Sequence, residues 1–247
     1  MFPFRDDNPR IGPPITTVAL IATNVLVWTL LQGMGTESGV TRSVCSLGLI
    51  PSALLGHLPP GSTVPIGEGV TCTIGGIPQW ATPLTSMFAH GGWFHLIGNM
   101  WFLWLFGDNV EDVMGHSRYV VFYLLSGLAA AAAQVVAEPG SSLPMVGASG
   151  AISGIMGAYV MLFPTVRVHM WVFLGFFMTR AAVPAYVMLG YWFLLQVMGG
   201  SLSALQAEGG GVAFMAHVGG FLAGAILVHL FKSRALLAER ERLLSPW

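Results

Sequence analysis

Long runs of apolar residues, separated by short polar segments, extend along most of the chain. Six of these runs cover residues 15–34, 93–113, 119–136, 149–163, 183–198 and 211–231. A helix needs roughly 17 to 25 mostly apolar residues to cross a lipid bilayer, and each run has or approaches that length. The pattern therefore predicts an all-α membrane protein with six transmembrane helices and a long outer loop between the first two.

A further apolar stretch, residues 169–178, is too short to be a span. It has ten residues and is bracketed by Arg167 and Arg180. Ten helical residues reach only about 15 Å, half of the hydrocarbon core. We expect this stretch to lie at the membrane interface or to lead into the fifth helix.

The composition agrees with a membrane protein and excludes an ordinary soluble domain. Hydrophobic residues make up 54% and charged residues 9% of the 247 positions, and the mean hydropathy is +0.71. A soluble domain has about 25% charged residues. The formal net charge is -1, so the chain offers no basic surface for nucleic acid and no excess charge that would keep it disordered.

The basic residues predict the orientation of the chain, because cytoplasmic loops carry an excess of Lys and Arg. With the N-terminus inside, nine of the ten basic residues are cytoplasmic and only Arg42 is outside. We expect a cytoplasmic, solvated tail at 1–14, a membrane domain at 15–232 and a second cytoplasmic tail at 233–247. The first apolar run lacks a cleavage-site pattern, so we expect it to be retained.

The connection 35–92 lies outside in this orientation. Connections of this length are usually functional or partly embedded. It holds both cysteines, Cys45 and Cys72, on the side where disulfides persist in bacteria. A disulfide and two unrelated cysteines are both compatible with the sequence.

A few polar side chains interrupt the predicted spans, and such residues are functional candidates because they are costly in lipid. His95 and Asn99 are four residues apart on the second span, so they share one helix face, and His90 precedes them. Ser149 begins the fourth span, and His217 lies near the start of the sixth. For His95 and Asn99 the alternative is an interhelical hydrogen bond without further function.

Helix lengths place three of these side chains at a similar depth. The fourth span has fifteen residues, which cover only about 22 Å of a core about 30 Å thick. If this helix ends at the inner interface, Ser149 lies about 8 Å below the outer surface. His217 and Asn99 lie at about 9 Å by the same rise per residue, so three helices bring polar groups to one layer.

The residues around Ser149 suit a reactive hydroxyl that a substrate can approach. Gly147 and Gly150 flank it in a Gly-x-Ser-Gly pattern, which permits a sharp turn and leaves backbone N–H groups free at the helix start. Small residues also recur at three- or four-residue spacing on the fourth and sixth spans, which predicts close packing of these helices. They are Gly150, Gly154, Gly157, Gly220 and Gly224.

No carboxylate is expected in the polar layer, because all eleven acidic residues fall in tails, loops or the inner end of the second span. A serine enzyme here would therefore use a dyad instead of a Ser-His-Asp triad. His217 would take the proton of Ser149. His95, Asn99 and backbone N–H groups would stabilise the oxyanion that forms on attack at a carbonyl.

These motifs closely resemble those of the rhomboid family of intramembrane serine proteases, of prokaryotic type with a six-helix core. The resemblance covers about residues 80–224 and the preceding helix. It rests on the combined order of His90-x4-His95-x3-Asn99, Glu111-x3-Gly115, Gly147-x-Ser149-Gly150 and Ala216-His217-x2-Gly220-x3-Gly224. It implies that Ser149 is the nucleophile and His217 the general base. It also implies oxyanion-hole roles for His95 and Asn99, and a structural role near the site for His90.

Two positions depart from the family pattern. Many members carry a Trp-Arg pair in the first outer loop, where this chain reads Trp80-Ala81. Family members often have an aromatic ring four residues after the nucleophile, packed against the catalytic histidine. Here that residue is Ser153, whose hydroxyl we expect to bond His217 or to hold a water. The resemblance also implies a lateral gate at the outer end of the fifth span, residues 186–198, which includes Trp192.

The expected function is that of an intramembrane serine endopeptidase that hydrolyses peptide bonds in or near the transmembrane segments of other proteins. The alternatives are a catalytically silent rhomboid-like protein that binds membrane helices, and a small transporter. Expected partners are single-span or polytopic membrane-protein substrates and the lipid bilayer, without nucleic acid, cofactor or metal; the oligomeric state is not indicated. The expected location is a prokaryotic inner membrane, with both termini cytoplasmic and the active site open to the outer side.

Overall fold

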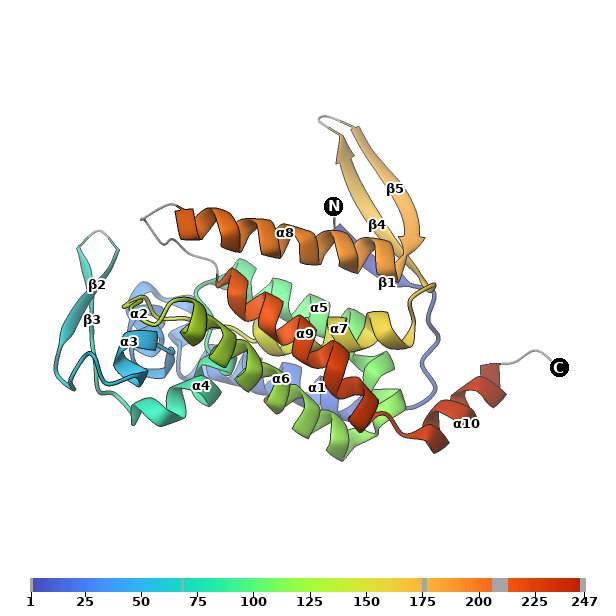
Figure 1. Cartoon of the computed structure of the whole chain (residues 1–247), viewed down its shortest axis with the longest axis horizontal. Helices are drawn as coiled ribbons and strands as arrows, with labels where there is room; N and C mark the ends of the chain where they lie inside the picture. The colour runs from blue at the N-terminus through green and yellow to red at the C-terminus, as the bar shows by residue number, and fades with distance from the viewer. Residues whose placement is uncertain (1, 68, 175–176, 206–212, 245–247) are drawn as a thin grey trace.

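The computed structural model describes residues 2–67, 69–174, 177–205 and 213–244. The chain is mainly helical, and its longest helices lie side by side (Figure 1). The helices are α1 (Ile15–Leu30), α2 (Glu37–Leu47), α3 (Pro51–Leu54), α4 (Thr82–Thr85), α5 (Trp93–Met114), α6 (His116–Ala137), α7 (Ser149–Leu162), α8 (Ala185–Leu205), α9 (Phe214–Phe231) and α10 (Arg234–Leu244). Two antiparallel sheets accompany them: one has the order β1-β4-β5, formed by Phe2–Asp6, Arg167–Leu174 and Phe177–Pro184, and the other pairs β2 (Thr63–Gly67) with β3 (Val70–Thr73).

Among the described residues, three helices are long and apolar enough to cross a membrane, namely α6, α9 and the Ala185–Leu202 part of α8. Helices α1 and α7 are apolar but shorter, with 16 and 14 residues. Helix α5 has 22 residues, and its last two turns carry Asp108, Glu111 and Asp112. These six helices correspond to the six apolar runs, while the number that crosses the bilayer stays a prediction.

Helices α7 and α9 pack with their backbones in direct contact. A Cβ added at Gly220 would overlap the carbonyl oxygen of Gly150, and one added at Gly224 would overlap that of Gly154. A Cβ at Gly157 would likewise overlap a carbonyl oxygen of α9. Any larger residue at these positions would push the two helices apart.

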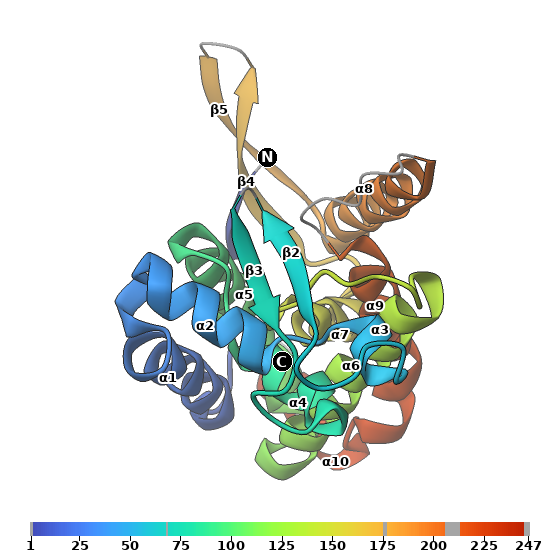
Figure 2. The same cartoon turned by 90° about the vertical axis from the view of Figure 1, so that its left-hand side faces the viewer.

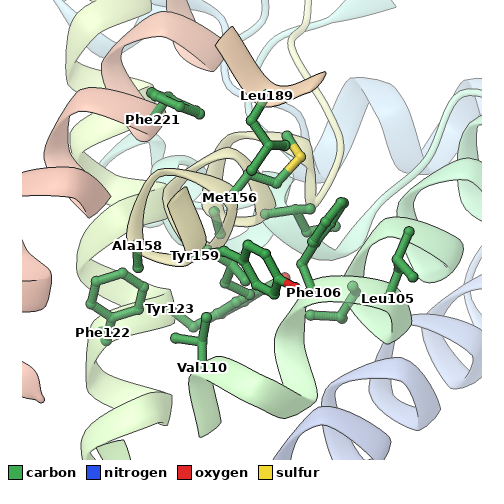
Figure 3. Packing of buried hydrophobic residues seen from close by; sticks show 14 of the residues in the cluster. Leu105, Phe106, Val110, Phe122, Tyr123, Met156, Ala158, Tyr159, Leu189 and Phe221 are labelled. Atoms are coloured by element: carbon green, nitrogen blue, oxygen red, sulfur yellow. The ribbon is translucent and has the colours of Figure 1, made fainter. Parts of the chain in front are cut away.

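Aromatic side chains fill the core beside this contact (Figure 3). Phe106 of α5, Tyr123 of α6 and Tyr159 of α7 are completely buried. The rings of Phe106 and Tyr159 meet edge to face, with centroids 5.0 Å apart. This geometry is favourable for two aromatic rings, so it ties α5 to α7.

For residues 169–178 the sequence predicted an interfacial segment or a lead-in to the fifth helix, but not the strands that the described residues form. They lie in a hairpin of β4 and β5, which projects from the helices beside the start of α8 (Figure 1). Val168 and Met170 are buried while Arg167 and His169 are not, and a period of two is that of a strand. The expectation of an all-α fold is corrected accordingly, and the interfacial location of this hairpin stays a prediction.

Both predicted tails contain ordered elements, which corrects the expectation that they are solvated. In residues 1–14, strand β1 pairs with β4. In residues 233–247, helix α10 carries Arg240, which is 4% exposed. Its guanidinium donates to Asp112 (3.0 Å) and Asn109 (3.0 Å) of α5 and to Asn8 (2.6 Å). The C-terminal end of α5 therefore binds α10, and Arg240 of α10 also binds the N-terminal segment.

Glu111 of α5 fixes the start of α1. Its carboxylate accepts the backbone N–H groups of Thr16 (2.7 Å) and Thr17 (2.8 Å). The first N–H groups of a helix have no acceptor within that helix, and negative charge is favourable there. This acidic side chain of the Glu111-x3-Gly115 motif is therefore a helix cap.

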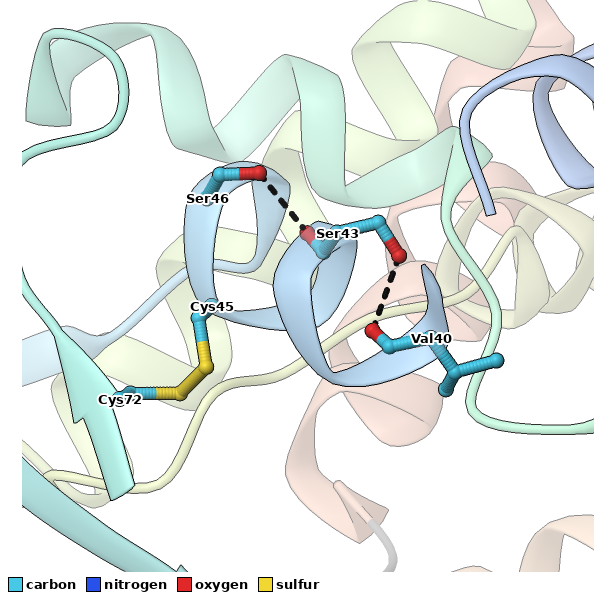
Figure 4. Close-up of a disulfide and its surroundings, with 5 residues drawn as sticks. All are labelled: Val40, Ser43, Cys45, Ser46 and Cys72. Atoms are coloured by element: carbon cyan, nitrogen blue, oxygen red, sulfur yellow. Dashed lines mark hydrogen bonds between the residues drawn. A yellow bond between two sulfur atoms is a disulfide. The ribbon is translucent and has the colours of Figure 1, made fainter. Parts of the chain in front are cut away.

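The 35–92 connection forms a compact layer across one end of the helices (Figure 2). Its main elements are α2, α3, α4 and the β2–β3 hairpin. Cys45 of α2 and Cys72 of β3 form a disulfide with Cα atoms 5.2 Å apart (Figure 4). The layer also meets the segment before α7, because Leu49 and Met145 exchange backbone hydrogen bonds of 2.9 and 2.8 Å.

Replacement of Gly224 by Ala should destabilise the protein by about 1 to 3 kcal/mol, because the new methyl group overlaps the backbone of α7. The measurement is thermal unfolding of purified protein in detergent. Gly190→Ala in α8 is the matched control, since no atom lies within 4 Å of a Cβ there. Equal melting temperatures for the two variants would contradict the close contact of α7 and α9.

The disulfide predicts that the unreduced protein contains no reactive thiol. Mass spectrometry after thiol alkylation should show no added label before reduction and two labels after it. Double replacement of Cys45 and Cys72 by Ser should lower stability by about 2 to 4 kcal/mol, because the unfolded chain gains freedom. Two labels on the unreduced protein would contradict this pairing.

Candidate active site

Ser149 is the first residue of α7 and follows a sharp turn. Gly147 in this turn has a φ of +126°, a conformation that favours glycine. The N–H of Gly147 donates to the carbonyl of Ser86 (2.8 Å). The serine hydroxyl thus lies at a helix N-terminus, where free N–H groups and the helix dipole favour negative charge.

His217 approaches Ser149 from α9. Its Nε2 lies 2.8 Å from the Oγ of Ser149, and its Nδ1 lies 2.8 Å from Oε1 of Gln196 on α8. The preceding backbone N–H, that of Ala216, donates to the side chain of Gln134 on α6 (3.2 Å). Three helices therefore place a hydroxyl, an imidazole and an amide in one hydrogen-bonded row.

A cavity of about 580 Å³ opens at this pair. Its lining includes the predicted site residues His95, Gly147, Ser149, Gly150 and His217. The Nδ1 of His95 accepts the N–H of Gly91 (3.2 Å), so the neutral ring carries its proton on Nε2. A Cβ at Gly147 would lie 2.6 Å from that Nε2 and 3.5 Å from Ser149 Oγ. Because Gly147 has no side chain, space remains between the Nε2–H of His95 and the Oγ of Ser149.

His90 and Asn99 are not among the residues that line this cavity. His90 is completely buried, and its ring meets that of His95 edge-on with centroids 5.1 Å apart. Burial lowers the pKa of His90 to about 3, so the ring is neutral at physiological pH. The side chain of Gln32 holds the backbone of His90 through bonds of 2.7 and 2.8 Å.

Asn99 is 7% exposed, and its Nδ2 has no hydrogen-bond partner among the described residues. A buried donor without an acceptor costs about 1 to 3 kcal/mol. The amide of Asn99 is therefore an unsatisfied donor below the protein surface, on the same face of α5 as His95.

For Ser153 the expected bond to His217 is wrong, while the alternative of a held water stays a prediction. Its hydroxyl donates to the carbonyl of Ser149 one turn earlier (2.6 Å). The ring of Trp192 on α8 lies beside His217 instead, with centroids 5.9 Å apart. The aromatic neighbour of the histidine therefore comes from α8 and not from α7.

Sequence reasoning missed Gln196 and Gln134. Both are amides inside apolar runs, so the argument that selected His95 and Asn99 applies to them equally. Gln196 also follows Trp192 by four residues, which places both on one face of α8. That spacing is the signal that could have identified the glutamine.

The helices, the cavity and the serine–histidine pair define a mainly helical membrane protein with a polar site among its apolar helices. Within that class, the chain belongs to the rhomboid family, because the family's Rhomboid domain model matches residues 78–234. This match confirms the resemblance seen in the motifs.

Relatives with rhomboid names occur in organisms from bacteria to mammals. The chain is 29% identical over 162 residues to Rhomboid protein 1, mitochondrial, of Saccharomyces cerevisiae, covering 64% of this chain and 43% of that protein. It is 31% identical over 147 residues to Rhomboid protease GluP of Bacillus subtilis, covering 60% and 24%. It is 33% identical over 86 residues to the mouse Presenilin-associated rhomboid-like protein, mitochondrial, covering 34% and 23%. The chain spans less than half the length of these curated relatives.

Proposed function

We propose that this chain is an intramembrane serine endopeptidase with Ser149 and His217 as its catalytic dyad. The observation that carries the proposal is the 2.8 Å distance between Ser149 Oγ and His217 Nε2 at a cavity. A general base must lie within such reach of the proton that it takes. The protease name of the Bacillus subtilis relative supports the same activity.

In the proposed reaction, His217 Nε2 takes the hydroxyl proton while Ser149 Oγ attacks the scissile carbonyl. The resulting imidazolium then gives this proton to the leaving amine, and an acyl-serine remains. A water molecule, deprotonated by His217, hydrolyses this ester and restores the hydroxyl. The acid–base steps use only this dyad.

The oxyanion that forms in each attack needs hydrogen-bond donors on the side of Ser149 that faces away from His217. The Nε2–H of His95 lies across the space that Gly147 leaves open, and the N-terminus of α7 supplies backbone N–H groups. Asn99 supplies a further amide donor from α5, since its Nδ2 has no acceptor among the described residues. In this proposal His90 supports the ring of His95 through their edge-on contact.

The proposed substrates are membrane proteins with one or several spans. Backbone carbonyls of a transmembrane helix are protected by hydrogen bonds within the helix, so the substrate must unwind before attack. Gly and Pro weaken a helix. Cleavage should therefore favour substrates with such residues near the scissile bond.

The proposed topology has six spans, both termini in the cytoplasm and the site open to the outer side of a prokaryotic inner membrane. The bias of basic residues supports this orientation. The disulfide supports it independently, because Cys45 and Cys72 lie in the layer that pairs with the segment just before Ser149. Disulfides persist outside the reducing cytoplasm.

Cleavage of a single-span model substrate in liposomes tests the proposal. Ser149→Ala and His217→Ala should each lower turnover by at least about 10³-fold, because either change removes the nucleophile or its base. Ser201→Ala in α8 is the control, since its exposed hydroxyl only bonds the carbonyl of Val197. Equal cleavage by wild type and Ser149→Ala would contradict the protease. Substrate binding without cleavage would favour a silent rhomboid-like protein.

Asn99→Ala should lower kcat by about 10² to 10³ with little change in KM, because it removes one oxyanion donor. The same change should leave stability unaltered or raise it, since the donor has no internal partner. Turnover and thermal unfolding of the same preparation measure the two effects. A wild-type kcat in Asn99→Ala would show that Asn99 is not an oxyanion donor. A large loss of stability in this variant would indicate a structural role.

A further inference from the structure

Helix α8 presents one buried face to the rest of the molecule and one exposed face. Ala185 and Leu189 are completely buried, and Trp192 and Gln196 continue the same face at intervals of three or four residues. The opposite face exposes apolar side chains, among them Leu194 and Met198. The amide of Gln196 is therefore directed into the protein and not into lipid.

The orientation of a histidine ring depends on what each of its two nitrogens contacts. A neutral imidazole carries its proton on one nitrogen, and a hydrogen bond at that nitrogen fixes the tautomer. The Nδ1 of His217 lies 2.8 Å from an amide oxygen, that of Gln196. An amide oxygen only accepts, so Nδ1 carries the proton and Nε2 presents its lone pair to Ser149, 2.8 Å away.

We propose that Gln196 is a positioning residue that holds His217 in the tautomer and ring orientation needed to deprotonate Ser149. The role rests on the function proposed above for these two residues. Gln196 touches neither the serine nor the space between Ser149 and His95, so it acts only through the imidazole. It supplies the third group that carboxylates supply in Ser-His-Asp triads, although no acidic residue of the described chain contacts His217.

The same helix fixes the imidazole from a second direction. Trp192 lies one turn before Gln196, and its ring is beside that of His217. Trp192 and Phe193 also lie against Phe221 of α9, with centroids 6.1 and 4.8 Å away. Both contacts of the imidazole depend on α8 lying against α9, so a displacement of α8 would release the base from its productive orientation.

Three variants separate positioning from structure. Gln196→Leu keeps the approximate volume but has no acceptor, and Gln196→Glu keeps an acceptor oxygen at the same reach. Ser201→Ala changes an exposed residue of α8 outside the expected gate residues 186–198. We expect Gln196→Leu to lower kcat by about tenfold to a hundredfold with KM nearly unchanged, because only the orientation of the base is lost. Gln196→Glu should restore most of kcat, and Ser201→Ala should match wild type.

A readout that needs no catalysis is the tautomer of His217. Nitrogen NMR of protein with ¹⁵N-labelled histidine, with the resonance assigned by its loss in His217→Ala, should show the proton on Nδ1 in wild type and in Ser201→Ala. Gln196→Leu should shift the population toward the Nε2–H form. The melting temperature of each variant shows whether the substitution also destabilises the fold.

Unchanged kcat or an unchanged tautomer in Gln196→Leu would overturn the role of Gln196. So would loss of kcat in both Gln196 variants together with a lower melting temperature, because that result describes a packing residue. A wild-type protein that does not cleave substrate would contradict the proposed function instead. In that case the NMR comparison still decides whether Gln196 orients His217.

Discussion

The direct contact between the backbones of α7 and α9 is the constraint on which the site depends. In lipid there is little hydrophobic force between helices, so packing and hydrogen bonds must hold them together. Gly150 follows Ser149 by one residue, Gly220 follows His217 by three, and these two glycines meet. The distance between hydroxyl and imidazole is thus set beside a contact of two rigid backbones, not by two flexible side chains.

Some buried polar groups in this protein are paired and others are not. At the C-terminal end of α5 they are paired: Glu111 caps α1, and Arg240 joins Asp112 and the N-terminal segment. Among the described residues several buried polar atoms lack a partner, including Asn99 Nδ2, Trp28 Nε1 and both ring nitrogens of His90. Paired groups contribute to stability, whereas an unpaired buried donor opposes it. For Asn99, the proposed oxyanion would supply the missing acceptor.

The apolar runs and the spaced glycines predicted the long helices and the contact between α7 and α9, because length and side-chain volume are local properties of the sequence. The 169–178 hairpin was missed since a ten-residue apolar stretch fits helix and strand alike. The motifs identified Ser149, His217 and His95 for the cavity. Gln196 and Trp192 were not assigned to His217, because the sequence does not show which face of α8 meets α9. The sequence alone does not decide whether the two cysteines pair, because the position of β3 against α2 is set by the tertiary fold.

The two roles considered for α8 impose opposite demands. The family resemblance implies a lateral gate at the outer end of this helix, and such a gate would have to move for a substrate helix to reach Ser149. As the helix that bears Trp192 and Gln196, it must lie against α9 for His217 to accept a proton. A substrate admitted by displacement of α8 would therefore meet a base without its two contacts. The proposed mechanism requires α8 to return against α9 before His217 takes the proton of Ser149.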